Sequence, residues 1–278
     1  MVNLNGTLTE QDVASISQNR AFLYGDGVFE TMKIRNGKVL FFEDHYFRLM
    51  SAMRILRMEI PMEFTMEYLE GEVLATAHAC NCASSARGRI TIYRNPGGHY
   101  MPLSNDVSFV ITTSELPVRD YVISDTRYEV DLYKDFYVAT QLLSTIKSTN
   151  RIINVIGNIY ALENQLDNCL LLNDRKNVIE ALNGNIFMVN GNRITTPPIS
   201  EGCLAGVMRK QLLAIIKSRA ELEIFEEVIS PFDLQKADEL FISNVILGIQ
   251  PITQYRKKEY GMEISRTLME ELNVRIHS

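Results

Sequence analysis

The alternation of hydrophobic and polar positions near the N-terminus predicts a hairpin followed by a helix. Residues 28–42 form two apolar stretches on either side of Asn36-Gly37, the dipeptide that is most typical of a tight hairpin turn. Residues 43–58 then carry apolar side chains at helical spacing. Pro61 follows, and proline ends a helix because it lacks a backbone N–H group.

The rest of the chain mixes both periodicities, so we expect an α+β protein. Pro117 and a local rise in charge mark residues 116–126 as a linker between two α+β domains, 1–115 and 127–278. A loop with Pro197-Pro198 is expected over 195–201. Further helices are expected over 63–79, 149–167, 204–219, 231–236 and 262–275, and strands over 89–94, 107–113, 169–173, 177–181, 185–189, 222–228, 239–243 and 248–254.

Composition narrows the possible partners of the protein. The 278 residues are 46% hydrophobic and 22% charged, which is ordinary for a globular protein with a substantial core. Thirty-four acidic residues against 28 basic ones, without a basic run, make nucleic acid an unexpected partner. No apolar run is long enough to span a bilayer, and no basic segment followed by an apolar one opens the chain. We therefore expect a cytoplasmic protein that does not bind membranes.

The four cysteines do not predict a metal site. Cys80 and Cys82 are separated by one residue, which is shorter than the usual spacing of zinc ligands, and no second cluster follows. Cys169 and Cys203 stand alone. We expect four reduced thiols and no bound metal.

Two residues in the second half of the chain suggest cofactor chemistry. Lys147 lies in the small, polar segment 144–150, and Glu180 follows about thirty residues later in 178–187. A lysine amine can form a Schiff base with an aldehyde, and a carboxylate can keep a pyridinium nitrogen protonated. Those are the two protein groups that pyridoxal phosphate chemistry requires most. Neither residue is specific alone, because most lysines are hydrated surface charges.

Three further places offer groups that suit a phosphate. The segment from Gly202 to Gly206 opens a predicted helix, whose first N–H groups and dipole favour an anion. Ser243 and Asn244 close a predicted strand, and Arg48 offers a two-pronged guanidinium. Each place also has an ordinary structural interpretation, as a turn, a strand end or an exposed charge. The usual nucleotide-binding motifs are absent from the sequence.

Five segments, in order along the chain, resemble the class IV aminotransferase family. This family of fold-type IV pyridoxal phosphate enzymes includes branched-chain aminotransferase, D-amino acid aminotransferase and aminodeoxychorismate lyase. The similarity covers most of the chain, and five ordered motifs are far more specific than any one of them. The segments are Tyr24–Thr31, Glu43–Leu49, Ile146–Asn150, Val178–Phe187 and Leu204–Arg209.

The resemblance implies a D-amino acid aminotransferase-like fold with a smaller N-terminal and a larger C-terminal domain. It also implies a cofactor, pyridoxal 5'-phosphate, in the cleft between the domains, and a homodimer. By the same resemblance, Lys147 forms the Schiff base, Glu180 meets the pyridine nitrogen and Arg48 grips the phosphate. The implied cofactor-binding residues are Arg48, Lys147, Glu180, Gly206, Val207, Met208, Ser243 and Asn244.

The resemblance also assigns substrate contacts, although several keep a structural alternative. The Gly-Asp-Gly motif before Phe29 and the loop from Arg94 to Pro102 would line the substrate pocket. Arg94, His99 or Tyr100 could anchor a substrate carboxylate, but Arg94 could also be a strand-end charge and His99 a loop residue without a role. The predicted substrate residues are Phe29, Arg94, His99, Tyr100, Val245 and Ile246.

Two reactions compete as the function. Segments 241–251 and 207–209 resemble 4-amino-4-deoxychorismate lyase more than the transaminases, with Val245 where a threonine is typical. Thr31 could supply a hydroxyl that the lyase uses beside its substrate, which makes it a predicted catalytic residue with Lys147 and Glu180. The alternatives are a transaminase for branched-chain or D-amino acids with a keto-acid acceptor and, less favoured, a non-catalytic cofactor-binding or interaction protein.

Overall fold

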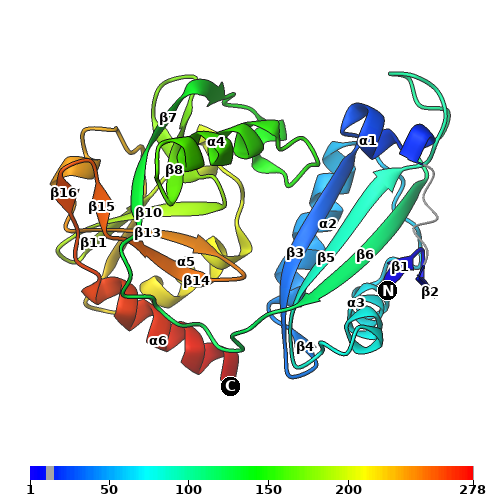
Figure 1. Cartoon of the computed structure of the whole chain (residues 1–278), viewed down its shortest axis with the longest axis horizontal. Helices are drawn as coiled ribbons and strands as arrows, with labels where there is room; N and C mark the ends of the chain where they lie inside the picture. Colours follow the sequence, from blue (N-terminus) through cyan, green and yellow to red (C-terminus); the bar gives the residue numbers. More distant parts are fainter. Residues whose placement is uncertain (11–15, 278) are drawn as a thin grey trace. The chain divides into compact units, whose positions relative to one another are not determined.

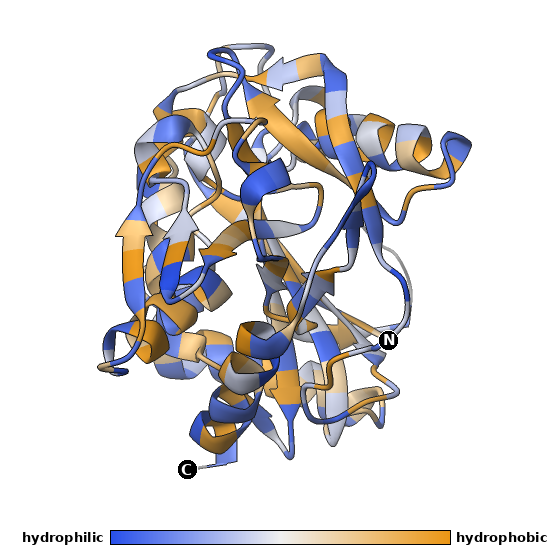
Figure 2. Ribbon diagram, turned by 90° about the vertical axis from the view of Figure 1, so that its left-hand side faces the viewer, coloured by the Kyte–Doolittle hydropathy of each residue, from blue (hydrophilic) through white to orange (hydrophobic). Residues whose placement is uncertain are grey.

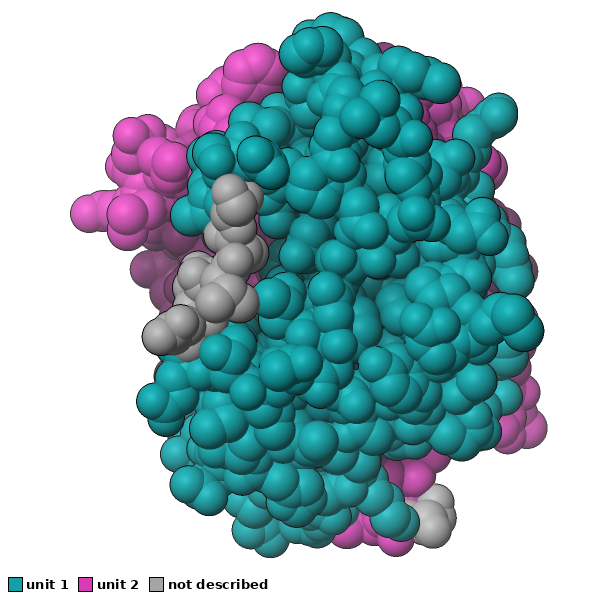
Figure 3. Space-filling model, turned by 90° about the vertical axis from the view of Figure 1, so that its right-hand side faces the viewer, with its two compact units in different colours: residues 1–120, 146–150 teal, residues 121–145, 151–278 magenta. Residues whose placement is uncertain are grey.

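A computed structural model describes residues 1–10 and 16–277 and divides the chain into two compact units. Unit 1 comprises residues 1–120 and 146–150, and unit 2 comprises 121–145 and 151–278 (Figures 1 and 3). The short segment 146–150, which carries Lys147, therefore belongs to the N-terminal unit. The predicted limits of the linker, 116–126, stay a prediction.

Unit 1 is a six-stranded antiparallel sheet that two helices cover on one face (Figure 1). Its strand order is β2-β1-β6-β5-β3-β4. The strands are β1 (Val2–Leu4), β2 (Thr7–Thr9), β3 (Gly27–Arg35), β4 (Lys38–Val39), β5 (Ser85–Arg94) and β6 (Val107–Glu115), and the helices are α1 (Arg20–Tyr24), α2 (Phe42–Ile55) and α3 (Met66–Ala79).

The predicted hairpin is confirmed and has the expected turn. Asn36 and Gly37 both have positive φ angles, 49° and 72°, and they join β3 to β4 in a two-residue loop. Positive φ at both central positions matches the right-handed twist of the flanking strands, and asparagine and glycine tolerate it best. The helices predicted over 43–58 and 63–79 are confirmed as α2 and α3, within a few residues at each end.

The two faces of the unit 1 sheet differ in character, because successive side chains on a strand point to opposite faces. Val28, Met32 and Ile34 of β3 belong to the core that packs against α2 and α3. Phe29, Thr31 and Lys33 alternate with this core-facing set and belong to the other face. Figure 2 colours the ribbon by hydropathy and shows hydrophobic and hydrophilic residues interspersed along the strands.

Unit 2 contains a ten-stranded mixed sheet with three helices. The order is β12-β11-β10-β9-β8-β7-β15-β16, and β13 pairs with β10 and β14. The strands are β7 (Glu129–Val138), β8 (Asn168–Asn173), β9 (Val178–Ala181), β10 (Gly184–Asn190), β11 (Arg193–Thr196), β12 (Glu223–Glu226), β13 (Glu239–Asn244), β14 (Gly248–Ile252), β15 (Gln254–Tyr255) and β16 (Lys258–Glu259), and the helices are α4 (Ile152–Glu163), α5 (Val207–Lys217) and α6 (Glu263–His277).

In the core of unit 2, two strands that are distant in the sequence are joined by an aromatic contact. Phe187 of β10 and Phe241 of β13 are fully buried and stack with ring centroids 4.9 Å apart. Aromatic pairs at this distance contribute beyond the area that they bury. This contact fixes β13 against β10, and it thereby positions the strand end that carries Ser243 and Asn244.

Several sequence predictions are wrong in detail, and each error has a local cause. Residues 193–196 form β11 instead of starting the predicted loop over 195–201, because they pair with both β10 and β12. The helix predicted over 204–219 begins only at Val207, since Gly202 has a φ of 94° and Gly206 is extended. The helix predicted over 231–236 is a single 3-10 turn, Leu234–Lys236. Strands β1, β2, β7 and β16 and helix α1 were not predicted.

Among the residues that the structure describes, none of the helices combines the length and hydropathy that crossing a bilayer would need. Within the same residues, no group of three or more histidine, cysteine, aspartate or glutamate side chains is arranged to hold a metal ion. All four cysteines are free thiols. Burial raises the pKa of both Cys169 and Cys203 to about 12, so neither is a thiolate at neutral pH.

Candidate active site

Lys147 is held at the edge of the unit 1 sheet, beside β3. The backbone N–H of Phe29 donates to the carbonyl of Lys147 at 2.8 Å, and the N–H of Thr149 donates to the carbonyl of Gly27 at 2.9 Å. Ser148 and Val28 form an antiparallel bridge between these two bonds. This pairing explains why the helix predicted from residue 149 begins only at Ile152: residues 147–149 continue the sheet instead.

The side chains of Lys147 and Arg89 both lie over the ring of Phe29. Its Nζ lies 4.7 Å from the centroid of the Phe29 ring, and the guanidinium carbon of Arg89 lies 3.8 Å from the same centroid. Both distances suit a cation–π contact. Thr31 is the direct cross-strand partner of Arg89, so its side chain lies on the same face. Phe29 and Thr31, both predicted site residues, are therefore on the Lys147 face of the sheet.

Arg89 is a candidate that the sequence interpretation missed. Its Nε donates to the Thr91 hydroxyl at 3.1 Å, which holds the guanidinium along the strand. The signal was present in the alternation of residues 85–94, where arginines occupy successive positions of one face. Without the pairing of β5 with β3, however, nothing in the sequence indicated that this face lies next to Lys147.

Arg48 forms a buried network with Glu30 and His45 on the helical face of the same sheet. The Nε and Nη2 atoms of Arg48 donate to the two carboxylate oxygens of Glu30 at 2.7 and 2.5 Å, and His45 Nδ1 lies 2.7 Å from Glu30 Oε2. Glu30 and His45 are each 1% exposed. The predicted contact of Arg48 with a phosphate stays a prediction, but the carboxylate of Glu30 already fixes how the guanidinium is oriented.

The charge states in this network follow from burial and from the neighbouring charges. Burial by itself would raise the pKa of Glu30, but the charge of Arg48 and hydrogen bonds from His45 and Arg48 outweigh it and lower the pKa to about 2. Burial lowers the pKa of His45, although Glu30 acts in the opposite direction. The Nε2 atom of His45 is buried and has no hydrogen-bond partner among the residues that the structure describes, which is consistent with a neutral ring that donates through Nδ1 to Glu30.

In unit 2, the predicted site residues Glu180 and Ser243 form one row across the sheet with Asn185, which lies between them. Glu180 of β9 is paired with Asn185 of β10, and Asn185 is paired with Ser243 of β13. Directly paired residues point to the same face, so the three side chains lie side by side. All three are buried. Among residues 1–10 and 16–277 the Ser243 hydroxyl has no hydrogen-bond partner, although a buried polar group of this kind is rarely left unsatisfied.

Two hydrogen bonds hold the loop before α5 against this row. The N–H of Leu204 donates to Glu180 Oε2 at 2.9 Å, and Asn185 Nδ2 donates to the carbonyl of Leu204 at 2.8 Å. A Cβ atom at Gly206 would lie 1.9 Å from Asn185 Oδ1, so a larger residue there would displace the Asn185 side chain from its bond to Leu204. Gly206 caps α5 without a side chain, and the first N–H groups of a helix have no partner within it. The structure thus brings Glu180, Ser243 and the predicted amides of Val207 and Met208 together within unit 2.

Three predicted site residues follow one another here: Asn244 ends β13, and Val245 and Ile246 lie in the turn that leads to β14. The side-chain oxygen of Asn244 accepts hydrogen bonds from the N–H groups of Ile246 and Leu247, at 3.0 and 2.9 Å. The carbonyl of Val245 accepts a hydrogen bond from the Tyr121 hydroxyl at 2.8 Å. These bonds account for the turn by themselves, and the predicted contacts of the three residues with cofactor and substrate stay predictions.

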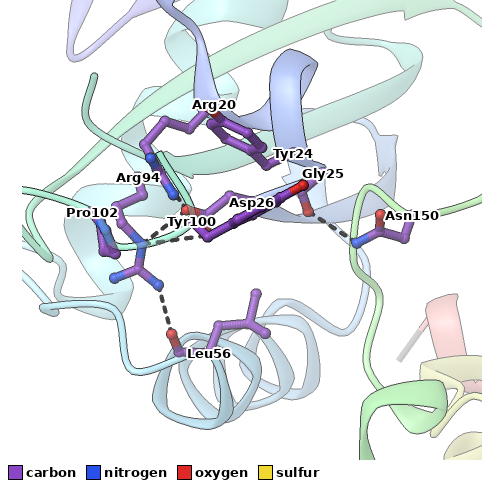
Figure 4. Close-up of a pocket in the computed structure, with 9 residues that line it drawn as sticks. All are labelled: Arg20, Tyr24, Gly25, Asp26, Leu56, Arg94, Tyr100, Pro102 and Asn150. Carbon is purple, nitrogen blue, oxygen red and sulfur yellow. Dashed lines mark hydrogen bonds and ion pairs between the residues drawn. The ribbon is translucent and has the colours of Figure 1, made fainter. Parts of the chain in front are cut away.

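Arg94 and the loop after it surround a separate cavity of unit 1, of about 270 Å³ (Figure 4). Asp26 accepts hydrogen bonds from Arg20 Nε at 2.9 Å and from Arg94 Nε at 3.0 Å. Arg20 also donates to the carbonyl of His99 at 2.7 Å, which holds the loop in place. The cavity is lined by Arg20, Tyr24, Gly25, Asp26, Leu56, Arg94, Tyr100, Pro102 and Asn150.

The predicted carboxylate anchors on this loop have different surroundings. All three guanidinium nitrogens of Arg94 already bind protein acceptors, which include the carbonyl of Leu56 at 2.7 Å. His99 is exposed, and the Tyr100 side chain is 92% exposed with its ring centroid 5.8 Å from that of Tyr24. The contacts of these residues with a substrate stay predictions. The geometry gives Arg94 an evident structural task, which is to hold the end of β5 against the segment after α2.

Comparison with known proteins defines the family. A family model described as amino-transferase class IV matches residues 27–255, and the chain therefore belongs to this family of enzymes. The chain is 29% identical over 285 residues to a putative branched-chain-amino-acid aminotransferase of Methanocaldococcus jannaschii, covering 97% of this chain and 94% of the relative. It is 26% identical over 263 residues to an aminodeoxychorismate lyase of Vibrio harveyi, covering 92% and 94%.

The fold agrees with this assignment. A crystal structure of the branched-chain aminotransferase of the thermophilic archaeon Thermoproteus uzoniensis superposes with a TM-score of 0.87 at 23% identity, covering 97% of this chain and 92% of that one. The predicted α+β fold of the fold-type IV enzymes is thereby confirmed. Membership of the family implies that the enzyme depends on pyridoxal phosphate.

Proposed function

We propose that the protein is a pyridoxal phosphate-dependent lyase that cleaves 4-amino-4-deoxychorismate to pyruvate and 4-aminobenzoate. The observation that carries this proposal is the position of Thr31 on the face of the unit 1 sheet that also carries Lys147 and Phe29. A hydroxyl on that face is available to a substrate whose amine replaces the lysine. The similarity to the lyase of Vibrio harveyi extends over almost the whole chain and supports the same assignment.

The residues present fit pyridoxal phosphate. Glu180 is hydrogen-bonded to the loop before α5, and Ser243 lies in the same row of strand residues. Within the described part of the chain the Ser243 hydroxyl lacks a partner, which a phosphate oxygen would supply. Lys147 would hold the aldehyde, Glu180 the pyridine nitrogen, and Ser243 with the amides of Val207 and Met208 the phosphate. When bound, the cofactor supplies an electron sink for charge that develops at the carbon next to the substrate amine.

The protein groups would then control protons and orientation. Once a substrate amine had displaced it, Lys147 Nζ would be available to accept the proton of the adjacent carbon. Glu180 is 6% exposed, and as an anion it would keep a proton on a neighbouring ring nitrogen. The Glu30 carboxylate orients Arg48, so a guanidinium that contacts the phosphate would be positioned before the substrate arrives.

A transaminase is the second candidate function. It is favoured by the 29% identity to a putative branched-chain aminotransferase over 97% of this chain. It would use the same residues, and it would pass the amino group to a keto acid instead of releasing pyruvate. A non-catalytic role is the weakest proposal, because a protein that only binds the cofactor needs neither Lys147 nor Glu180 in these positions.

One assay separates the two reactions. Purified enzyme is given 4-amino-4-deoxychorismate without any keto acid, and pyruvate and 4-aminobenzoate are measured. We expect both products in equal amounts. If neither forms while leucine and 2-oxoglutarate yield glutamate, the lyase proposal is wrong and the transaminase takes its place.

Replacing Ser243 by alanine should have opposite effects on the empty and the loaded protein. Removing an unpaired buried hydroxyl relieves its desolvation, so the cofactor-free protein should gain about 1 kcal/mol in unfolding free energy. Loss of a phosphate contact should raise the dissociation constant for pyridoxal phosphate about tenfold. Chemical denaturation and equilibrium titration measure the two quantities.

Ser265 provides the matched control for this substitution. It is also fully buried, but its hydroxyl donates to Glu239 Oε2 at 2.9 Å. Ser265→Ala should therefore destabilise the protein and leave cofactor affinity unchanged. Equal destabilisation by both substitutions, without a change in affinity, would show that Ser243 has no part in the phosphate site.

We also propose that two copies of the chain associate through the exposed side of α4. Ile152, Val155, Ile159 and Leu162 recur at helical spacing on one face, and each is at least 51% exposed. A contiguous apolar face of this kind usually marks an interaction site. Sedimentation equilibrium should give twice the mass of the 31.7 kDa chain; a single-chain mass at all concentrations would contradict the proposal.

A further inference from the structure

Glu201 of unit 2 is a buried acid whose burial the proposed chemistry does not explain. It ends the 3-10 turn η3 (Ile199–Glu201) and directly precedes Gly202 and the loop that leads to α5. Its exposed fraction is only 5%. Glutamate is almost never buried to this extent unless its carboxylate is paired. The partners of Glu201 therefore indicate what the residue does.

All the side-chain partners of Glu201 come from one turn, residues 173–177, which connects β8 to β9. Asn173 Nδ2 and Asn177 Nδ2 donate to Glu201 Oε2 at 2.7 and 2.9 Å. Arg175 Nη2 donates to Glu201 Oε1 at 2.8 Å. Hydrogen bonds to an ionised acceptor are about twice as strong as neutral ones. The carboxylate thus joins the segment before α5 firmly to the β8–β9 turn.

The 173–177 turn is ordered independently of Glu201. Asn173 is fully buried, and its Oδ1 accepts hydrogen bonds from the N–H groups of Arg175 and Asn177, both at 3.0 Å. The N–H of Asn173 also donates to the carbonyl of Asn177 at 3.0 Å. An asparagine that bonds the backbone a few residues ahead holds a tight turn in shape. Glu201 therefore binds a preformed set of donors.

The same hairpin holds the loop at a second point. β9 begins at Val178, directly after the turn, and it carries Glu180, whose Oε2 accepts from the N–H of Leu204 at 2.9 Å. Residues 201–204 are therefore attached to the β8–β9 hairpin at both ends, through Glu201 at the turn and through Leu204 at Glu180. Attachment at both ends removes most of the conformational freedom of such a short segment.

The loop between η3 and α5 needs such an attachment, because its own sequence favours flexibility. Gly202 has a φ of 94°, Gly206 is extended, and helical structure begins only at Val207. Glycine loses more conformational freedom on folding than any other residue. The direction of the first N–H groups of α5 therefore depends on how the loop is anchored at its start.

We propose that Glu201 is a positioning residue for the cofactor phosphate, and that it acts by anchoring the loop that orients the first N–H groups of α5. The inference rests on the proposed function, in which the amides of Val207 and Met208 hold that phosphate. Donors that are already oriented need no reorganisation when an anion arrives. A loop released from the turn would have to be ordered by the phosphate itself, which lowers affinity.

The effect should be confined to the phosphate end of the cofactor. Glu180, the proposed partner of the ring nitrogen, lies on β9, which pairs with β8 on one side and β10 on the other. These strands hold Glu180 in place whether or not Glu201 is anchored. Loss of the Glu201 carboxylate should therefore weaken the contribution of the phosphate to binding and leave the contribution of the ring nearly unchanged.

The test compares pyridoxamine 5'-phosphate with pyridoxamine, which differ only by the phosphate group. Neither carries an aldehyde that Lys147 could capture, so the comparison is independent of that residue. Their dissociation constants are measured by calorimetry on the cofactor-free full chain. We expect the wild-type protein to bind the phosphorylated form about 100-fold more tightly, as two charge-assisted contacts would give.

In Glu201→Gln this preference should fall to about tenfold, with the pyridoxamine constant unchanged. Glutamine can accept hydrogen bonds through one side-chain atom only, and it presents N–H groups to the donors of the turn. Asn177→Ala is the milder variant, because it removes one donor and leaves the backbone of the turn intact. Its preference should fall to about 30-fold.

Glu239→Gln is the matched control. Glu239 is also 5% exposed, and its carboxylate also accepts three hydrogen bonds, from the N–H groups of Ile264 and Ser265 and from the Ser265 hydroxyl. These donors lie at the start of α6. Both glutamine variants should unfold at lower urea concentration than the wild type, but only Glu201→Gln should lose preference for the phosphorylated ligand.

Two results would overturn the role of Glu201. One is an undiminished preference in Glu201→Gln or, if that variant does not fold, in Asn177→Ala. The other is an equal fall in Glu239→Gln, which would trace the effect to a general loosening of unit 2. The proposed function fails in a different way: a wild-type protein that binds both ligands equally would show that the start of α5 does not hold the phosphate, and the inference would fall with it.

Discussion

Replacing Lys147 by alanine should lower turnover at least about 10³-fold, because the substitution removes both the covalent anchor and the proposed proton acceptor. General-base catalysis alone contributes about 10²–10⁴-fold to enzymatic rates. The backbone of residue 147 pairs with β3 through its carbonyl, so an alanine can occupy the same position without disturbing the sheet. The loss should therefore appear in kcat while the unfolding free energy changes little.

Two measurements separate this chemical loss from a structural one. Borohydride treatment of the loaded wild-type enzyme should fix the cofactor to the peptide that contains Lys147, and the variant should give no such adduct. Lys134→Ala, at an exposed position of β7, is the control and should retain full turnover. An active Lys147→Ala enzyme, or an adduct on a different lysine, would contradict the assignment.

Replacing Glu30 by alanine should destabilise unit 1 by about 3–5 kcal/mol, the cost expected when one partner of a buried ion pair is removed. The substitution leaves the Arg48 guanidinium, whose side chain is 12% exposed, and the His45 ring, which is 1% exposed, without their shared carboxylate. Chemical denaturation at neutral pH measures the change. Glu227→Ala is the control, since the side chains of Glu227 and its partner Arg193 are 53% and 41% exposed and surface pairs contribute about 0–1 kcal/mol.

The same network should make stability depend on pH in a defined window. The folded-state pKa of Glu30 is about 2, against 4.5 for an ordinary glutamate, so the unfolded chain binds a proton at higher pH than the folded chain does. The contribution of Glu30 to stability is therefore fully present above pH 4.5 and is lost as the pH falls toward 2. The free energy of unfolding that Glu30 contributes, and that is lost over this range, is about 3 kcal/mol.

His45 adds to this dependence with the same sign. Burial lowers its pKa below the ordinary value of 6.5, so the unfolded chain again takes up the proton first as the pH falls. Denaturation of the wild-type protein at pH 7, 5 and 3 should show a progressive loss of unfolding free energy. In Glu30→Ala the part below pH 4.5 should be reduced. An unchanged pH profile in the variant would mean that other carboxylates dominate the acid sensitivity.

Neighbouring side chains of β3 point to opposite faces of the unit 1 sheet and have different tasks. Glu30 belongs to the same Tyr24–Thr31 segment that resembles the family, yet its side chain points to the helical face, where it binds Arg48 and His45. Phe29 and Thr31 point to the opposite face. One strand therefore serves two purposes, because alternate side chains of β3 orient the proposed phosphate residue on one face and border Lys147 on the other.

Local sequence determined those features of the protein that depend on neighbours in the chain. The Asn36-Gly37 turn requires positive φ angles that few other residues tolerate, so the hairpin was predictable. The helical spacing of residues 43–58 likewise predicted α2, because an apolar stripe must face a core. The family followed from five motifs whose order in the chain is preserved. In each case the information lies within one short segment.

Only the tertiary structure decided features that depend on distant segments. The sequence predicts a helix from residue 149, but residues 147–149 pair with β3, because open hydrogen-bonding groups on that strand outweigh local propensity. Arg94 is occupied by Asp26 and by carbonyls that are far away in sequence. The Ser243 hydroxyl lacks a partner only because three strands bury it beside Asn185, and Arg89 reaches Phe29 only through the register of β3 and β5. Pairing between remote strands sets these positions, and no local pattern in the sequence records it.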